Sequence, residues 1–449
     1  MHRRFIRPPV ALVLTLVLLS VTFSARQQGT PASTTTGTAA EFFTPTRVWK
    51  AHLTMTPEAW EAMQPRNTGS GGFGFGGGRF LGPPGGRNGV AARQGVEFDY
   101  VHASLEIGDW TFADVAARFK GNGSYLRATR GGGDKISIKV DLNKYVKGQK
   151  LAGLATLNFQ NNITDAGWMN EVLAYRLYRD AGALAPRTTY AQVYLTVGGQ
   201  AQRYLGLYSI SENVDDNFAQ DRFGTRKGAI FKPSTQDLFT DFGSDWAAYN
   251  QSYDPKTDLT DAQKQRVIAL GRLVSHADDA EFAAKIGDFV DLDDFARYFA
   301  VLVWIANYDS LLQNGQNFYT YLHPDTNRMH FIAWDQDFSF GNGRSNYGVS
   351  VLSPGGNSRF LTRMYKVEAF RAKYLALMAT FSDRLFLADR FMQQVSEIGP
   401  AIRPSIQLEG EEWLSGFDRI ASGQSGIVPF VTSRAASVKA ELEQVNGKK

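Results

Sequence analysis

The chain of 449 residues contains no cysteine, and its six histidines do not have the spacing of a metal-binding motif. The lack of cysteine excludes disulfides, thiolate zinc sites and cysteine nucleophiles. A chain without cysteine can also be exported with no requirement for disulfide formation. These absences remove several common classes of active site from consideration.

The chain also lacks a strong net charge once its first residues are set aside. The formal charge of +4 includes Arg3, Arg4 and Arg7, so the remaining residues carry 45 basic and 44 acidic side chains. We therefore expect no nucleic-acid partner, because proteins that bind nucleic acids present a basic patch.

The composition and length of the chain indicate how its core is organised. Hydrophobic residues make up 43% of the chain, which is enough for a real core, and the chain is longer than one core usually supports. Two lobes or domains are expected.

Residues 1–24 contain no acidic residue and have the pattern of a secretory signal peptide. Their arginines precede an apolar stretch from Val10 to Phe23, and the small residues Thr22 and Ser24 favour cleavage after Ser24. A short membrane anchor is the alternative, but the apolar run is shorter than the ~20 residues of a spanning helix. We expect no stable membrane span after cleavage, and a secreted, periplasmic or cell-envelope location.

The rest of the chain changes in composition along its length. Residues 25–45 are rich in threonine, serine, alanine and glycine, and predict a flexible leader. Residues 69–89 are dominated by glycine, and no strand and helix bracket them. We interpret them as a mobile surface loop rather than a phosphate-binding loop. Sheet-forming patterns dominate residues 46–233, and helical patterns dominate residues 234–449.

Hydrophobic periodicity predicts several individual elements. Residues 193–197 and 204–210 form a hairpin around two glycines, and residues 231–233 are interpreted as the last strand of the sheet-rich region. Thr164 and Asp165 are expected to cap a helix with an apolar stripe. Further helices are expected over 261–274, 293–306, 361–387 and 432–445.

The most informative stretch begins where an apolar helix leads into Asp309, and continues to a short strand that ends before Asp335 and Asp337. Asp, Asn and Gly are also the ordinary residues of turns, so the pattern alone does not require chemistry. However, Asn314 and Asn317 lie between the acidic positions, and carboxylate and amide oxygens suit hard cations such as Mg²⁺. We predict a metal site in which Asp335 or Asp337, with Asn314 or Asn317, holds the ion.

The spacing within this stretch is typical of protein kinases. Asp309 and Asn314 form Asp-x4-Asn, the spacing of the kinase catalytic base and magnesium-binding amide. Asp337 and Phe338 begin like the kinase Asp-Phe-Gly, although Ser339 replaces the glycine. No His-Arg precedes Asp309, so this is not the ordinary eukaryotic-type kinase pattern.

The first half of the chain contains a glycine-rich segment that suits phosphate binding. Its glycines let backbone N–H groups approach an anion, and its serine adds a donor. A glycine-rich hairpin turn is the alternative interpretation. The segment consists of Lys120, Gly121, Asn122, Gly123 and Ser124.

Many ordered motifs of the chain resemble those of one family. In the first half they are Arg118-Phe119-Lys120-Gly121-Asn122-Gly123-Ser124, Ile138-Lys139-Val140-Asp141, Leu157-Asn158 through Asn162, Thr164-Asp165, Met169-Asn170-Glu171 through Ala174-Tyr175, Ala185-Pro186-Arg187-Thr188, Gly206-Leu207-Tyr208, Glu212-Asn213-Val214-Asp215 and Phe231-Lys232. In the second half they are Asn307-Tyr308-Asp309, Asn317-Phe318-Tyr319 and Trp334-Asp335-Gln336-Asp337. Over roughly residues 46–435 the chain resembles the spore coat protein H (CotH-like) kinases, which are atypical secreted protein kinases.

The resemblance implies an α+β protein with a two-lobed atypical protein-kinase-like fold. A sheet-rich N-lobe would span residues 46–233 and a mainly helical C-lobe residues 234–449. The implied activity is transfer of the γ-phosphoryl of ATP, with Mg²⁺ or Mn²⁺, to Ser, Thr or Tyr of an exported protein. Asp309 would orient or deprotonate the acceptor hydroxyl, and the segment 120–124 would cover the nucleotide.

The resemblance also implies residues that contact the nucleotide. Lys139 would be held by Glu171 and contact the α and β phosphates, as in kinases, whereas two unrelated surface charges are the alternative. Relatives are often more basic along this strand, where this chain has Ser137, so the lysine is Lys139 or a neighbour. Glu212 would hydrogen-bond the base or the ribose.

Two other functions remain compatible with these residues. One is a non-catalytic surface or envelope protein that keeps the fold as a binding module. The other is a different adenylate-dependent transfer, such as AMP transfer, on the same scaffold. Retention of every acidic and amide position argues against a dead enzyme but does not separate the two transfers.

Overall fold

A computed structural model describes residues 37–67, 81–130, 132–235, 237–343, 349–354 and 358–446. The expected signal peptide, residues 25–36 of the expected leader and residues 69–80 of the glycine-rich loop lie outside these ranges. Within them, no helix combines the length and the apolar character needed to cross a membrane.

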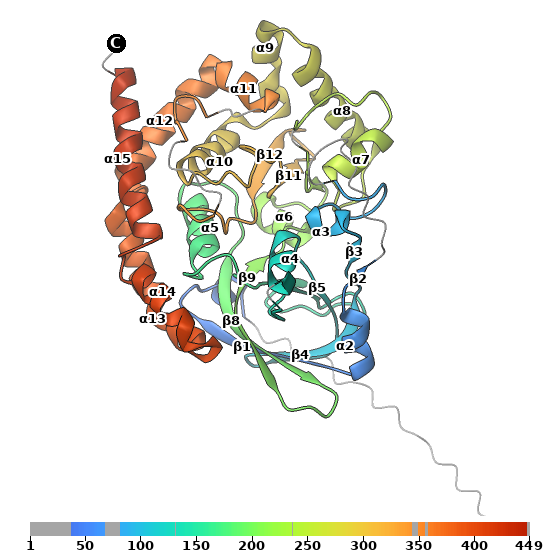
Figure 1. The fold of residues 1–449 in the computed structure, drawn as a ribbon. Coiled ribbons are helices and arrows are strands. Elements are labelled where there is room, and N and C mark those ends of the chain that lie inside the picture. Colours follow the sequence, from blue (N-terminus) through green and yellow to red (C-terminus); the bar gives the residue numbers. More distant parts are fainter. Residues whose placement is uncertain are drawn as a thin grey trace, which may run out of the picture. The chain divides into compact units, whose positions relative to one another are not determined.

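The described chain has a mixed α+β fold, with a sheet-rich first part and a mainly helical C-terminal part (Figure 1). The sheet-rich part is a closed seven-stranded barrel with the order β1-β4-β5-β6-β7-β9-β8. Closure was not expected from the sequence, and it leaves the barrel without a free edge. The strands are β1 (Val48–Met55), β4 (Val101–Ile107), β5 (Trp110–Phe119), β6 (Ile138–Asp141), β7 (Thr156–Gln160), β8 (Thr188–Val197) and β9 (Arg203–Glu212).

The barrel closes through its one parallel pair, between β1 and β8, in which Val48 lies opposite Tyr190. The other neighbouring strands of the barrel are antiparallel. Strands β8 and β9 form the hairpin predicted from the sequence. Alternate residues such as Leu105 and Ile107 of β4 are fully buried, which is the period-two burial expected of a barrel with a packed interior.

A separate three-stranded sheet has the order β10-β11-β12, with β10 (Ala229–Phe231), β11 (Phe318–Leu322) and β12 (Met329–Ala333). The interpretation of residues 231–233 as the last strand of the sheet-rich region is wrong, because Phe231 lies opposite Thr320 of β11. Lys232 directly follows the first strand of this second sheet, and the last strand of the sheet leads to Asp335.

The helices of the structure include most of those predicted from the sequence. The expected helix over 361–387 is divided at Val367, whose backbone is extended. A short helix lies inside the expected flexible leader, where Phe42 stacks on Trp49 and is buried. The helices are α1 (Ala39–Phe42), α2 (Pro57–Met63), α3 (Val90–Arg93), α4 (Gly123–Arg130), α5 (Asn170–Asp180), α6 (Asp216–Phe223), α7 (Ala247–Tyr253), α8 (Asp261–His276), α9 (Asp279–Phe289), α10 (Leu292–Trp304), α11 (Arg359–Lys366), α12 (Glu368–Arg384), α13 (Ala388–Glu409), α14 (Glu411–Ala421) and α15 (Ile427–Asn446).

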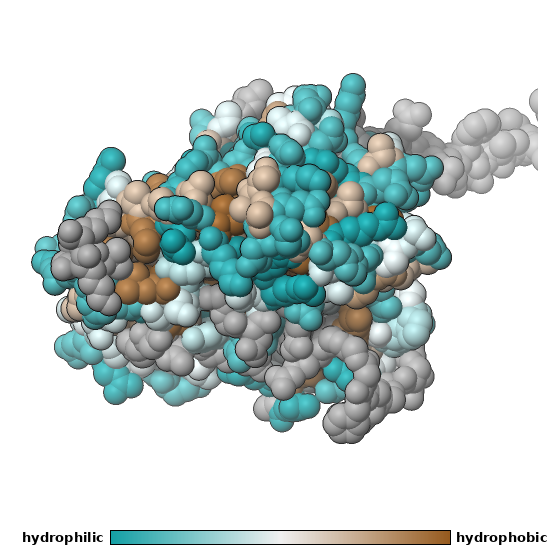
Figure 2. Space-filling view, turned by 90° about the horizontal axis from the view of Figure 1, so that it is seen from above, coloured by the Kyte–Doolittle hydropathy of each residue, from teal (hydrophilic) through white to brown (hydrophobic). Residues whose placement is uncertain are grey.

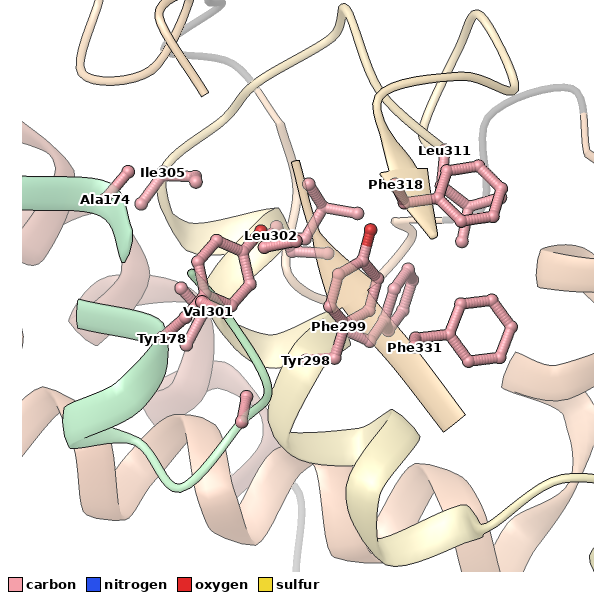
Figure 3. Packing of buried hydrophobic residues seen from close by; sticks show 14 of the residues in the cluster. Ala174, Tyr178, Tyr298, Phe299, Val301, Leu302, Ile305, Leu311, Phe318 and Phe331 are labelled. Atoms are coloured by element: carbon pink, nitrogen blue, oxygen red, sulfur yellow. The ribbon is translucent and has the colours of Figure 1, made fainter. Parts of the chain in front are cut away.

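Helix α10 lies at the centre of the largest hydrophobic core. Asp291 caps its N-terminus by accepting a hydrogen bond from Asp294 N at 2.9 Å. Tyr298 and Leu302 of α10 pack between Tyr178 of α5 and the strands β11 and β12 (Figure 3). Because α10 is buried on nearly all sides, the chain that leaves its C-terminus is held in place.

The surface of the described residues seen from above is mostly hydrophilic, with hydrophobic residues in small groups (Figure 2).

Candidate functional site

The first part of the site is the turn that follows α10. The carboxylate of Asp309 accepts hydrogen bonds on Oδ1 from the Asn314 amide at 2.6 Å and from the Gln316 amide at 2.8 Å. The Asn317 amide donates to the backbone oxygen of Asp309 at 2.7 Å, and Asp309 N donates to Asn307 Oδ1 at 3.0 Å. The structure thus joins three residues singled out in the sequence and adds Gln316, which the Asp-x4-Asn spacing did not indicate.

The second part is the segment that follows β12. Asp335 has a left-handed backbone with φ of 56°, and its N–H donates to the hydroxyl of Tyr175 at 2.9 Å. The carboxylate of Asp337 accepts a hydrogen bond from the hydroxyl of Thr164. Helix α5 and the loop before it therefore orient both aspartates.

The loop before α5 differs from the sequence prediction. Thr164 does not cap the helix, because α5 begins only at Asn170. Asp165 organises this loop by accepting hydrogen bonds from Gly167 N at 2.8 Å and Asn170 N at 2.7 Å. The hydroxyl of Thr164 is thereby available to Asp337.

Glu171 lies inside the same region and is 4% exposed. Its carboxylate accepts hydrogen bonds from the Tyr175 hydroxyl at 2.7 Å and from the Ser211 hydroxyl at 3.3 Å. Burial, followed by the charge of Asp335, raises the pKa of Glu171 to about 7. The charge of Lys120 acts in the opposite direction on this pKa.

Lys120 follows β5 and points its ammonium into this acidic cluster. Its Nζ donates to Gln160 Oε1 at 2.9 Å and lies 5.4 Å from the centroid of the Trp334 ring. Burial, followed by the charge of Lys232, lowers the pKa of Lys120 to about 7, whereas Asp335 and Glu171 oppose this shift. Lys120 and Glu171 therefore belong to one electrostatic cluster.

Lys139 occupies a different position from the one the kinase-like pair implied. It lies opposite Arg118 of β5 and Asn158 of β7. Burial, followed by the charge of Arg118, lowers the pKa of Lys139 to about 8, and the charge of Asp215 opposes this shift. Lys120, which follows β5 and does not lie on the strand of Lys139, is the lysine whose charge acts on Glu171.

The segment 121–124 is a strand-to-helix connection, and the hairpin-turn alternative is wrong. Lys120 N still donates to Ser137 O at 2.8 Å, and α4 then begins at Gly123. Gly121 has φ of +108°, and a Cβ there would lie 2.6 Å from Ser124 Oγ. The connection therefore requires glycine at this position.

The described end of the glycine-rich loop, residues 81–89, is held against this connection and against α7. Arg87 Nη1 lies 3.4 Å from Gly121 O and from Asn122 Oδ1. Asn88 donates to Gln251 O at 2.6 Å. This part of the loop is anchored by hydrogen bonds, unlike the mobile loop expected from its composition.

Glu212 has contacts that assign it to the structure of the barrel. Its carboxylate accepts hydrogen bonds from Arg187 N and Nε at 3.0 Å, from Arg187 Nη2, and from Arg222 Nη2 at 3.0 Å. The carboxylate is 2% exposed and is occupied by two guanidinium groups. These contacts do not support the expectation that Glu212 binds the base or the ribose.

The aspartates have the chemistry of a hard-cation site. Burial, followed by the charge of Asp335, raises the pKa of Asp337 well above its usual value, and Asp309 contributes in the same direction. Across the described ranges, no three His, Cys, Asp or Glu side chains are gathered as a ready-made metal site. Two carboxylates with amide oxygens fit Mg²⁺ or Mn²⁺, because such ions usually complete their shell with water and substrate phosphates. A cation there would relieve the repulsion between Asp335 and Asp337.

Comparison with known proteins identifies the family. The family model described as CotH kinase protein matches residues 117–438, more than half of the chain, and the chain belongs to this family. A relative is the inner spore coat protein H of Bacillus subtilis (strain 168), 23% identical over 301 residues that cover 65% of this chain and 79% of the relative. These matches confirm the resemblance found in the sequence.

One solved structure is also similar in part. It is a chain of the toxin–antitoxin complex of HipA, HipB and operator DNA from Shewanella oneidensis MR-1, with 12% identity and a TM-score of 0.29. The match covers 64% of this chain and 58% of that chain. A TM-score this low supports no argument about fold or function.

Proposed function

We propose that this protein is a metal-dependent protein kinase that transfers the γ-phosphoryl of ATP to a Ser, Thr or Tyr hydroxyl of an exported protein. The observation that carries the proposal is the buried cluster of Lys120, Glu171, Asp335 and Asp337, whose charges act on one another, with the charge of Asp309 acting on both aspartates. Membership of the CotH kinase family supports the proposal. The spore coat relative supports a location that is secreted, periplasmic or in the cell envelope.

The basic side of the cluster suits nucleotide phosphates. Lys120, with Glu171 nearby, would contact the α and β phosphates, as the lysine of a kinase does. Backbone N–H groups of residues 121–124 would approach the same phosphates from the start of α4. Lys139 lies on the neighbouring strand and would add positive charge.

The acidic side suits the metal and the acceptor. Asp335 and Asp337, with Asn314 or Asn317, would hold Mg²⁺ or Mn²⁺, which neutralises the charge that develops on the transferred group. Asp309, oriented by two amides, would accept a hydrogen bond from the acceptor hydroxyl. It would take the proton of that hydroxyl as the new O–P bond forms and the bond to ADP breaks.

The decisive experiment incubates purified protein and a protein acceptor with ATP labelled at either the γ or the α phosphate, in the presence of Mg²⁺ or Mn²⁺. We expect label from the γ phosphate in the acceptor and none from the α phosphate. Label from the α phosphate would instead establish adenylate transfer. ATP binding without transfer under either metal would favour a binding module.

The metal site is tested separately by titrating Mn²⁺ into the ATP complex of Asp335→Asn and Asp337→Asn. Removing either negative charge is expected to weaken the metal-dependent component of ATP binding. Asp325→Asn is the matched control, because Asp325 is exposed in the turn between β11 and β12. Titrations of both variants that coincide with that of the control would exclude these aspartates as ligands.

A further inference from the structure

We infer that Lys232 is a further phosphate-binding residue of the candidate site, and that Lys232 and Lys120 together hold the polyphosphate of a nucleotide beside Trp334. The inference rests on the proposed function, because it names an additional ligand-binding residue of the same site. Neither sequence spacing nor the kinase-like pattern assigned a role to Lys232.

Lys232 and Lys120 come from distant parts of the chain and meet at one indole. Lys232 follows β10, and its Nζ lies 5.6 Å from the centroid of the Trp334 ring and 5.5 Å from that of Tyr319. Lys120 Nζ lies 5.4 Å from the same Trp334 ring. Trp334 immediately precedes Asp335, so both ammonium groups stand next to the expected metal ligands.

Neither lysine forms an ion pair with a carboxylate in the described part of the chain. In the described part of the chain, no ion pair or side-chain hydrogen bond is made by Lys232, and Lys120 donates to the neutral amide of Gln160. Another buried lysine does have such a partner, because Lys135 forms an ion pair with Glu409 at 2.7 Å. A buried cation without a carboxylate is costly, and the aromatic rings offset only part of this cost.

The groups around Lys232 point to an anionic ligand. The charges that act on Lys232 include those of two further cations, Lys256 and Arg87. The acidic groups that act on Lys232 are Asp335 and Asp254, but Asp254 is already paired with Lys256 at 2.6 Å. If Asp335 binds a metal ion, its charge is no longer available to the lysines. A polyphosphate that binds the metal and both lysines satisfies all of these charges.

The inference is tested with Lys232→Met, which keeps the length and apolar stem of the side chain. Its affinity for ATP with Mn²⁺, measured by calorimetry, is expected to fall about 10- to 100-fold through loss of a charge-assisted contact. Its affinity for adenosine is expected to stay within about 2-fold of the parent, because adenosine has no phosphate. Lys256→Met is the matched control, with an affinity for ATP expected within about 3-fold of the parent.

Two results would overturn the inference and leave the proposed function intact. One is equal ATP affinity of Lys232→Met and the parent. The other is an equal loss of ATP and adenosine affinity, which would mean that Lys232 maintains the shape of the pocket. A parent that binds neither ATP nor tripolyphosphate with Mn²⁺ would remove the inference and the proposed function together.

A second measurement needs no variant and so does not depend on the folding of Lys232→Met. Lysines of the parent protein are acetylated with acetic anhydride, with and without ATP and Mn²⁺, and modification is quantified by mass spectrometry. ATP is expected to slow modification of Lys232 and Lys120 by at least about 5-fold and to leave Lys256 unaffected. Equal modification of Lys232 in both conditions would overturn the inference.

Discussion

Two buried glutamates that lie close together, Glu212 and Glu171, are held in opposite ways. Glu212 is 2% exposed and is bound by the guanidinium groups of Arg187 and Arg222. Glu171 is 4% exposed and is bound by the hydroxyl groups of a tyrosine and of Ser211, the residue before Glu212. Lys120 is the cation that favours its charged form, and the pKa of Glu171 is raised to about 7.

The difference separates a structural ion pair from a ligand site. The charge of Glu212 is compensated within the protein, so its removal would leave two arginines without their buried partner. The charge of Glu171 is shared with Lys120 and with aspartates that repel it. Such a cluster would be stabilised most by a cation and an anion that bind together. Ionisable groups with strongly shifted pKa values are typical of functional sites.

The largest expected effect of a substitution is at Asp309, which belongs to the proposed ligand site. Asp309→Asn keeps the shape of the residue but removes the proposed base, so the rate of phosphoryl transfer should fall about 10²- to 10⁴-fold, or roughly 3–5 kcal/mol of barrier. The measurement compares transfer and ATP affinity at equal concentrations of folded protein. A variant with lower stability but an unchanged rate would show that Asp309 only holds the turn.

The next largest effect is expected at Glu212, on the structural side. Glu212→Ala should lower the free energy of unfolding by about 3–5 kcal/mol, because it breaks a buried ion-pair network. Glu171→Ala should lower it by less than about 2 kcal/mol, because only two hydroxyl hydrogen bonds are lost. Urea unfolding of both variants measures the difference. Equal losses would erase the distinction between the two glutamates.

A pH dependence of stability is expected from the pair Lys120 and Glu171. Between about pH 4.5 and 7 the folded protein binds more protons at Glu171 than the unfolded chain does, so stability falls as pH rises. Between about 7 and 10.5 the unfolded chain binds more protons at Lys120, so stability rises with pH.

The pair should therefore contribute a minimum of stability near pH 7, with a depth on the order of 1–3 kcal/mol. The double variant Glu171→Gln with Lys120→Met should lack this minimum when unfolding is followed across the pH range. A minimum that persists in the double variant would assign it to other groups.

The smallest effect is expected at Tyr175, whose hydroxyl links Glu171 to the backbone of Asp335. Tyr175→Phe should lower the free energy of unfolding by about 1–2 kcal/mol through the loss of these bonds. Tyr178→Phe on the same helix is the control, because in the described structure the Tyr178 hydroxyl is buried without a hydrogen-bond partner. Thermal unfolding should show the control as stable as the parent or more so.

Local patterns in the sequence predicted much of the helical part. Apolar periodicity located α8 and α10. The break at Val367 was missed, because the residues on both sides favour helix and the division depends on tertiary packing. Sequence also located the hairpin of β8 and β9, whose turn is local.

The pairings that build the site could not be predicted in this way. Whether Lys120 or Lys139 meets Glu171 depends on which strand positions face the cluster, and this is fixed by long-range pairing. The assignment of β10 to a second sheet depends on β11, which lies far along the chain. Thr164 and Lys232 gain their contacts with the site only through these pairings.

The parallel contact of β1 with β8 also has a consequence for how the chain folds. Val48 and Tyr190 are 142 positions apart, so β1 cannot complete its pairing until β8 has been synthesised. Until then the outer edges of β1 and β7 are open to other strands, which favours misassociation and makes the final closure slow. A chain shortened before β8 would therefore be expected to aggregate, even though most of the barrel strands are already present.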